Sequence, residues 1–289
     1  MRLFSGVGLV LAALLALPHQ ANAQLLAPVQ VAEPPASPLR VSHAPELSIL
    51  ARVENEPLRW QPWLAVAPLL GATLAFSFSG EVGEARWRGA GPIDSSFRAA
   101  VLHSGAGRRR AQRASDILMY SSIAAPVADA LLWPAPEGAT RGRTTYRLLT
   151  LDALSYAVSG LFIASTKRLI GRARPYAVDC NADSADARCD LSSRNESFIS
   201  GHTATAFTGA SLVCAHQRLR GHSVIGHLEC ITAMGMAAAT GALRMAGEKH
   251  YISDVLAGAA VGILSGYVLP LLLYRAPAEP APEDTIYVW

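Results

Sequence analysis

Long apolar segments broken by proline and glycine constrain the fold of this 289-residue chain more than any other feature. Apolar residues make up 51% of the chain and charged residues 16%, and the apolar segments are rich in alanine, leucine and glycine, without strand-like alternation. The segments of helical length are 60–78, 116–133, 148–170, 202–219, 230–245 and 251–274. Pro134, Pro136 and Pro175 mark breaks that are typical of helix ends. We therefore expect an all-α fold, a six-helix bundle.

The two ends of the chain differ from this apolar middle. Residues 1–23 have the features of a secretory signal, with Arg2 near the start, an apolar stretch from Val7 to Leu17, and Ala21-Asn22-Ala23 before the expected cleavage point. An uncleaved anchor is the alternative, although the apolar stretch is shorter than the ~20 residues of a spanning helix. The expected organisation is a signal peptide at 1–23, a Pro-rich linker at 24–58, a helical domain at 59–275 and a tail at 276–289.

The formal net charge of +3 is modest, and the basic residues are scattered between apolar segments. No basic arm with interleaved aromatic residues is present in the sequence. This distribution argues against nucleic acid as a partner.

The four cysteines fall into two local pairs, Cys180 with Cys189 and Cys214 with Cys230. In an exported chain, an even number at short separations predicts disulfides, and four free thiols are the alternative. One pair follows the third predicted helix and the other flanks the connection after the fourth, so the pairs should lie at opposite ends of the bundle.

If both pairs are oxidised, both ends of the bundle face an oxidising compartment, whereas a six-span membrane protein would leave one pair in the cytosol. Asp129 and Asp152, inside predicted helices, also disfavour full exposure to lipid. We therefore expect an exported protein, periplasmic or associated with the envelope, and an integral inner-membrane bundle is the alternative.

Three short stretches carry side chains suited to an anion. In the first, Lys167 and Arg174 are seven residues apart, and a helix would place both on one face just before Pro175. Two fixed cations on one face can hold a phosphate. Such a cluster, taken alone, more often compensates a helix dipole.

The second stretch, Ser200-Gly201-His202, directly precedes an apolar helical segment. Ser200 is a candidate N-cap, Gly201 allows an anion to approach the backbone, and free N–H groups at a helix start bind anions. A protonated His202 beside that anion could give its proton to a leaving oxygen. An ordinary cap with an incidental histidine is the alternative.

In the third stretch, His250 and Asp254 are four residues apart and would be neighbours on a helix. Asp254 would then accept a hydrogen bond from one ring nitrogen of His250 and leave the other nitrogen free to attack. A structural pair is the alternative, but a position at the start of a long apolar helix favours a functional one.

Taken together, the three stretches resemble the type 2 phosphatidic acid phosphatase superfamily, which also includes bacterial non-specific acid phosphatases and vanadium haloperoxidases. The family motifs are Lys, six residues, Arg-Pro; then Pro-Ser-Gly-His; then Ser-Arg, five residues, His, three residues, Asp. The matching residues, in the same order and with the same internal spacings, are Lys167, Arg174-Pro175, Ser200-Gly201-His202, Arg244, His250 and Asp254. Ile199 and Leu243 replace the family's proline and serine, which puts affinity and substrate range in doubt.

The resemblance implies a bundle of the phosphatidic acid phosphatase/haloperoxidase type that hydrolyses a phosphate monoester or diphosphate through a phosphohistidine intermediate. His250 would be the nucleophile, oriented by Asp254, and His202 the general acid. The groups expected to hold the phosphate oxygens are Lys167, Arg174, Ser200, Gly201 and Arg244. No cofactor is implied, and phosphate or vanadate is expected to bind as an anion.

No metal is expected, because His216, His222 and His227 lack a ligand pattern and are predicted to lie on the surface. The substrate is expected to be a phosphorylated lipid or a small phosphoester, and contact with a membrane surface stays open. The alternatives are a vanadium-dependent haloperoxidase and a catalytically inactive envelope protein of the same fold.

Overall fold

The computed structural model describes residues 61–80, 82–101, 105–132, 139–180, 189, 192–220 and 223–273. The predicted signal peptide, the Pro-rich linker and the tail at 276–289 lie outside these residues.

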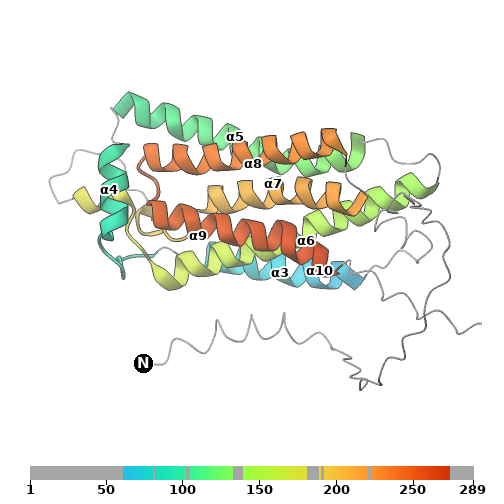
Figure 1. The fold of residues 1–289 in the computed structure, drawn as a ribbon. Coiled ribbons are helices and arrows are strands. Elements are labelled where there is room, and N and C mark those ends of the chain that lie inside the picture. Colours follow the sequence, from blue (N-terminus) through green and yellow to red (C-terminus); the bar gives the residue numbers. More distant parts are fainter. Residues whose placement is uncertain are drawn as a thin grey trace, which may run out of the picture. The chain divides into compact units, whose positions relative to one another are not determined.

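Every regular element in the described ranges is a helix, which confirms the all-α class (Figure 1). The longer helices are α3 (Gln61–Phe78), α5 (Gly105–Leu132), α6 (Ala139–Ile170), α7 (Gly201–Arg220), α8 (Val224–Ala246) and α9 (Ile252–Ile263). The shorter elements are α4 (Pro92–Ala100), the 3₁₀ turns η1 (Pro175–Asp179) and η3 (Ser192–Asn195), and a π-helical turn, η4 (Leu264–Val268), that joins α9 to α10 (Leu269–Leu273). A single isolated β-bridge joins Trp87 and Arg172 in this part of the chain.

Within the described residues, each apolar segment predicted to be helical corresponds to a helix, and the last one corresponds to the succession of α9, η4 and α10. Three helices begin earlier than the apolar pattern indicated. α5, α6 and α8 start at Gly105, Ala139 and Val224, where residues 116, 148 and 230 were expected. In α5 the additional turns include the Arg-rich sequence 108–113, which no apolar stripe could reveal. The short helix α4 was not predicted, because its nine residues are mostly polar or small.

Helix α7 occupies the centre of the bundle and packs against α5, α8, α9 and α6 (Figure 1). Its buried face is built from small residues, among them Ala204, Ala206 and Ala210, which are fully buried. At Gly209 a Cβ atom would lie 1.9 Å from the backbone oxygen of Ser122 on α5. A glycine is therefore required for the close approach of α7 to α5.

Both predicted disulfides are present, between Cys180 and Cys189 and between Cys214 and Cys230. The first belongs to the segment between α6 and the N-terminal end of α7. Cys214 lies about 20 Å further along α7, from the rise of 1.5 Å per residue, and its disulfide joins α7 to α8. The two disulfides thus stabilise opposite halves of the bundle, as the sequence predicted.

A buried ionic cluster holds α5, α6 and α7 together in the half of the bundle that contains Cys214. His216 is fully buried, with its Nδ1 atom 2.7 Å from Asp129 and its Nε2 atom 3.0 Å from Asp152. The expectation that His216 lies on the surface is therefore wrong. Burial is tolerated because both ring nitrogens have a carboxylate partner; His222 lies outside the described residues, and His227 is exposed.

Several outer helix faces expose large apolar side chains to solvent. On α3 these include Leu64, Leu70, Leu74 and Phe78, of which Phe78 is 82% exposed. Among the described residues, two helices are long and apolar enough to cross a membrane, Gly142–Ile170 and Ile252–Leu273; 56% of the apolar window of the first is buried in the protein and 33% of the second. The core helix of a soluble protein passes the same test of length and composition.

Candidate active site

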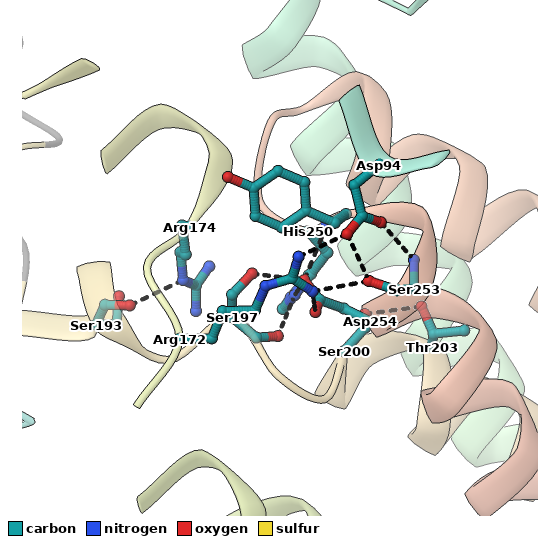
Figure 2. A network of polar contacts seen from close by, with 11 residues as sticks. Asp94, Arg172, Arg174, Ser193, Ser197, Ser200, Thr203, His250, Ser253 and Asp254 are labelled. Atoms are coloured by element: carbon teal, nitrogen blue, oxygen red, sulfur yellow. Dashed lines mark hydrogen bonds and ion pairs between the residues drawn. The ribbon is translucent and has the colours of Figure 1, made fainter. Parts of the chain in front are cut away.

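The first motif straddles the end of α6. Lys167 lies in the last turn of the helix, and the chain leaves α6 at Gly171, which has a φ of 57°. Arg174 therefore lies beyond the helix, as the residue before η1, and the predicted position of Lys167 and Arg174 on one helical face is wrong. The Nε atom of Arg174 donates to the carbonyl of Ser193 at 2.8 Å, which fixes the guanidinium plane (Figure 2).

Arg174 is buried and Lys167 partly buried, and neither has an ion-pair partner among the described carboxylates. Burial, together with the neighbouring charges of Arg174 and Arg244, lowers the pKa of Lys167 to about 8. Burial also lowers the pKa of Arg174. Unpaired buried cations are costly, so this pair marks a position where an anion would relieve the repulsion.

The second motif forms the N-terminal end of α7. Ser200 precedes the helix and accepts the N–H of Ala204 at 2.9 Å, but its hydroxyl pairs with the hydroxyl of Thr203 at 2.8 Å. A Cβ atom on Gly201 would lie 3.1 Å from Ile163 Cγ2 and 3.5 Å from the ammonium nitrogen of Lys167. Gly201 thus lets the start of α7 approach Lys167 closely, and the helix N-terminus adds its own positive potential there.

His202 and Arg244 share one carboxylate that the sequence analysis did not select, that of Asp116 on α5. Asp116 Oδ1 lies 2.8 Å from His202 Nε2 and 3.2 Å from an Arg244 terminal nitrogen. Burial, followed by the charge of Arg244, lowers the pKa of His202 to about 4, although Asp116 opposes this shift. Burial, followed by Arg174, lowers the pKa of Arg244 to about 10.

His250 lies in the turn before α9 and not within the helix, so its predicted helical pairing with Asp254 is wrong. Its Nδ1 atom donates to the backbone carbonyl of Ser197 at 2.8 Å, whereas the nearest Asp254 oxygen is 3.8 Å away. The separation of 3.8 Å exceeds a hydrogen bond. The predicted tautomer is nevertheless fixed, because a carbonyl can only accept, so Nδ1 carries the proton and Nε2 has the lone pair.

Asp254 is fully buried and interacts with three other groups (Figure 2). Its Oδ2 atom accepts the hydroxyl of Ser197 at 2.6 Å and the backbone N–H of Tyr251 at 2.9 Å, and its Oδ1 atom pairs with Arg172 at 2.5 Å. Asp254 thus caps α9 and neutralises Arg172.

Arg172 anchors the short helix α4 to the site. Its guanidinium is fully buried, 3.9 Å from the ring centroid of Trp87 and 4.2 Å from that of Tyr251, and it pairs with Asp94 of α4 at 2.6 Å. The sequence analysis missed Arg172 and Asp94. Arg172 stands inside the first motif, between Lys167 and Arg174, so a third cation there was the available signal. No signal near Asp94 pointed to the site.

The predicted cations and histidines meet at one end of the bundle. Burial, followed by the charges of Arg174, Arg244 and Lys167, holds the pKa of His250 well below its ordinary value. The same end carries the N-terminal ends of α7 and α9 (Figure 1). The roles of the individual residues remain predictions.

Three cations and two histidines lie at one end of an all-α bundle, and such a set of groups is chemically suited to a tetrahedral oxyanion. Residues 148–277, which contain all three motifs, match the PAP2 superfamily. The resemblance inferred from the motifs is thereby confirmed.

The chain is also similar to a lipid A 1-phosphatase of Porphyromonas gingivalis, with 34% identity over 142 residues. The alignment covers 47% of this chain and 27% of the relative, so the chain matches about a quarter of that protein's length. No solved structure matches the chain significantly.

Proposed function

We propose that this protein is a phosphatase that hydrolyses a phosphate monoester or diphosphate, with a phosphorylated lipid as substrate. The observation that carries the proposal is the cluster of Lys167, Arg174 and Arg244, three cations of which Arg244 alone has an ion-pair partner among the described carboxylates, Asp116. A phosphate dianion supplies the missing negative charge. The family match and the similarity to a lipid A 1-phosphatase support the same activity.

In the first step, His250 Nε2 attacks phosphorus in line, so an N–P bond forms as the bond from phosphorus to the leaving oxygen breaks. His202 gives its proton to that oxygen, and the alcohol departs neutral. The low pKa of His202 belongs to the site without an anion. A bound dianion pairs with Arg244 and Lys167, the neighbours that repel a proton from His202, and therefore favours the protonated acid.

In the second step, neutral His202 takes a proton from water as the water oxygen attacks phosphorus. The N–P bond breaks, its electron pair returns to His250 Nε2, and inorganic phosphate is released. Both steps need positioning and charge stabilisation more than any further chemical group. Lys167, Arg174 and Arg244, with the hydroxyl of Ser200 and the N–H of Gly201, would hold the three non-bridging oxygens.

A lipid substrate and an envelope location are supported by the outer surface and by the disulfides. Exposed leucines on α3 and on α9, such as Leu74 and Leu256, offer apolar surface beside a lipid. The disulfides in both halves of the bundle favour an oxidising compartment. We therefore place the protein outside the cytosol, in the periplasm or against a membrane surface.

The test is phosphate release by the purified protein from lipid A, phosphatidate, undecaprenyl diphosphate and a chromogenic monoester. We expect turnover of at least one lipid substrate, and a labelled, acid-labile phosphoprotein after rapid quenching. Failure to release phosphate from all four substrates would contradict the proposal. Halide oxidation in the presence of vanadate, without phosphatase activity, would assign the haloperoxidase function instead.

A further inference from the structure

Ser197 connects the carboxylate of Asp254 to the imidazole of His250. The serine is fully buried, and its hydroxyl donates to Asp254 Oδ2 at 2.6 Å. Its carbonyl accepts the Nδ1–H of His250 at 2.8 Å, and its N–H donates to the carbonyl of Arg172 at 2.9 Å. Every polar group of Ser197 is therefore engaged, and two of its partners are Asp254 and His250 (Figure 2).

Asp254 has little freedom to reach His250 directly. Both carboxylate oxygens already have partners, with Ser197 and the Tyr251 N–H on one oxygen and Arg172 on the other. Arg172 is itself held between the rings of Trp87 and Tyr251. A shift of Asp254 towards the imidazole would break contacts within a fully buried network, where unsatisfied groups are costly.

We infer that Ser197 is a positioning residue and that Asp254 acts on His250 through it. Asp254 fixes the Ser197 hydroxyl, and the Ser197 carbonyl then fixes the ring orientation and the Nδ1–H tautomer of His250. The inference rests on the proposed function in one respect, because it takes His250 as the nucleophile. It does not follow from the family motifs, in which Ser197 has no place.

The group that accepts the hydrogen bond from His250 Nδ1–H, the carbonyl of Ser197, matters for the chemistry. The carbonyl that orients the imidazole is uncharged, and Arg172 neutralises the Asp254 carboxylate 3.8 Å from Nδ1, so the attraction of the surrounding cations for phosphate is little diminished near Nε2. Because a misplacement of about 1 Å in reacting groups can cost about 100-fold in rate, loss of the Ser197 hydroxyl should lower kcat and leave KM nearly unchanged.

The kinetic test is a double-mutant cycle with Ser197→Ala, Asp254→Asn and the double variant. We expect Ser197→Ala to lower kcat about 30-fold, within the range for misplaced reacting groups, with KM within about threefold. The double variant should be no slower than Asp254→Asn by more than about threefold, because both changes interrupt one connection. If the loss of kcat in the double variant equals the product of the losses in the two single variants, the inference is overturned. An unchanged kcat in Ser197→Ala would also overturn it.

A control is Ser211→Ala, which also removes a fully buried hydroxyl, in this case from a residue of α7. Ser211 Oγ has no hydrogen-bond partner in the part of the chain that the structure describes, and it lies on α7 well beyond His202. The kcat of the Ser211→Ala variant should equal that of the unmodified protein. A loss equal to that of Ser197→Ala would mean that any buried serine truncation impairs turnover, and would overturn a specific role for Ser197.

A second readout does not depend on activity. Long-range ¹⁵N–¹H NMR spectra of ¹⁵N-histidine-labelled protein report which ring nitrogen of His250 carries the proton. We expect the Nδ1–H tautomer alone in the unmodified protein and a mixture in Ser197→Ala. A pure Nδ1–H tautomer in both proteins would overturn the inference even if phosphatase activity were found, whereas the expected mixture would support it even if no substrate were hydrolysed.

Discussion

The two halves of the bundle both bury charge, but they satisfy it differently. Around His216, Asp129 and Asp152 contact the ring nitrogens at 2.7 and 3.0 Å, and Arg220 also pairs with Asp129. Around His250, Lys167 and Arg174 have no described carboxylate partner. Paired buried charges hold helices together, whereas unpaired ones cost stability and persist where a ligand compensates them.

The protonation states of the two buried histidines, His216 and His250, differ for the same reason, which is the presence or absence of carboxylate partners. Burial alone lowers the pKa of His216, but its hydrogen bonds to Asp129 and Asp152 outweigh burial and raise the pKa above its ordinary value. Burial and three cations together hold the pKa of His250 well below its ordinary value. The first histidine is therefore kept as a structural cation, and the second as a neutral base with a free lone pair.

His250→Ala should have the largest effect, and it should distinguish the two halves of the bundle most clearly. Because the substitution removes the proposed nucleophile, kcat should fall by about 1000-fold or more. The helical circular dichroism and the melting temperature should stay close to those of the unmodified protein, since the lost contact is one hydrogen bond to Ser197. Phosphatase activity near normal in this variant would show that another group attacks phosphorus.

The sequence alone predicted the residues of this site better than their geometry. Fixed spacings identified Lys167, Arg174, His202, Arg244 and His250, because the family motifs record residue types and not helix ends. The positions at which α6 ends and α9 begins were not predictable from apolar periodicity. For that reason the expected pairs on one helical face were wrong, for Lys167 with Arg174 and for His250 with Asp254.

Contacts between residues distant in sequence were also beyond prediction. Asp116 lies 86 residues before His202, and Asp94 lies 78 residues before Arg172, so no local pattern relates either pair. His216 was expected at the surface because its local sequence is polar, and its two carboxylate partners come from other helices. The helices themselves were predictable because their apolar faces are local patterns.

His216→Ala tests the other half of the bundle. The substitution leaves Asp129 with Arg220 and Gln217 and leaves Asp152 without its imidazole partner, so we expect a loss of about 3 kcal/mol in the free energy of unfolding. Denaturant unfolding measures this change. The kcat of the folded protein should stay within about twofold. A stable variant with impaired turnover would show that the two halves are coupled, and the comparison drawn above would fail.

Lys167→Met should have effects of opposite sign on binding and on stability. Replacing a partly buried ammonium that has no described ion-pair partner with an apolar side chain of similar length should raise the free energy of unfolding by about 1 kcal/mol. Removal of one phosphate contact should weaken inorganic phosphate binding about 30-fold, in line with a charge-assisted hydrogen bond. Thermal melts and calorimetric titration measure the two effects. Lower stability would show that Lys167 is already compensated in the site without an anion.

The smallest effect is the pH dependence of anion binding. Since burial lowers the pKa of Lys167 to about 8, its positive charge is present below that pH and lost above it. A bound dianion favours the charged form, so phosphate should bind about tenfold more weakly at pH 9.5 than at pH 7.5, with net proton uptake on binding. Calorimetry in two buffers of different ionisation enthalpy measures that uptake. In Lys167→Met the pH dependence over this window should disappear, and its persistence there would assign the proton to another group.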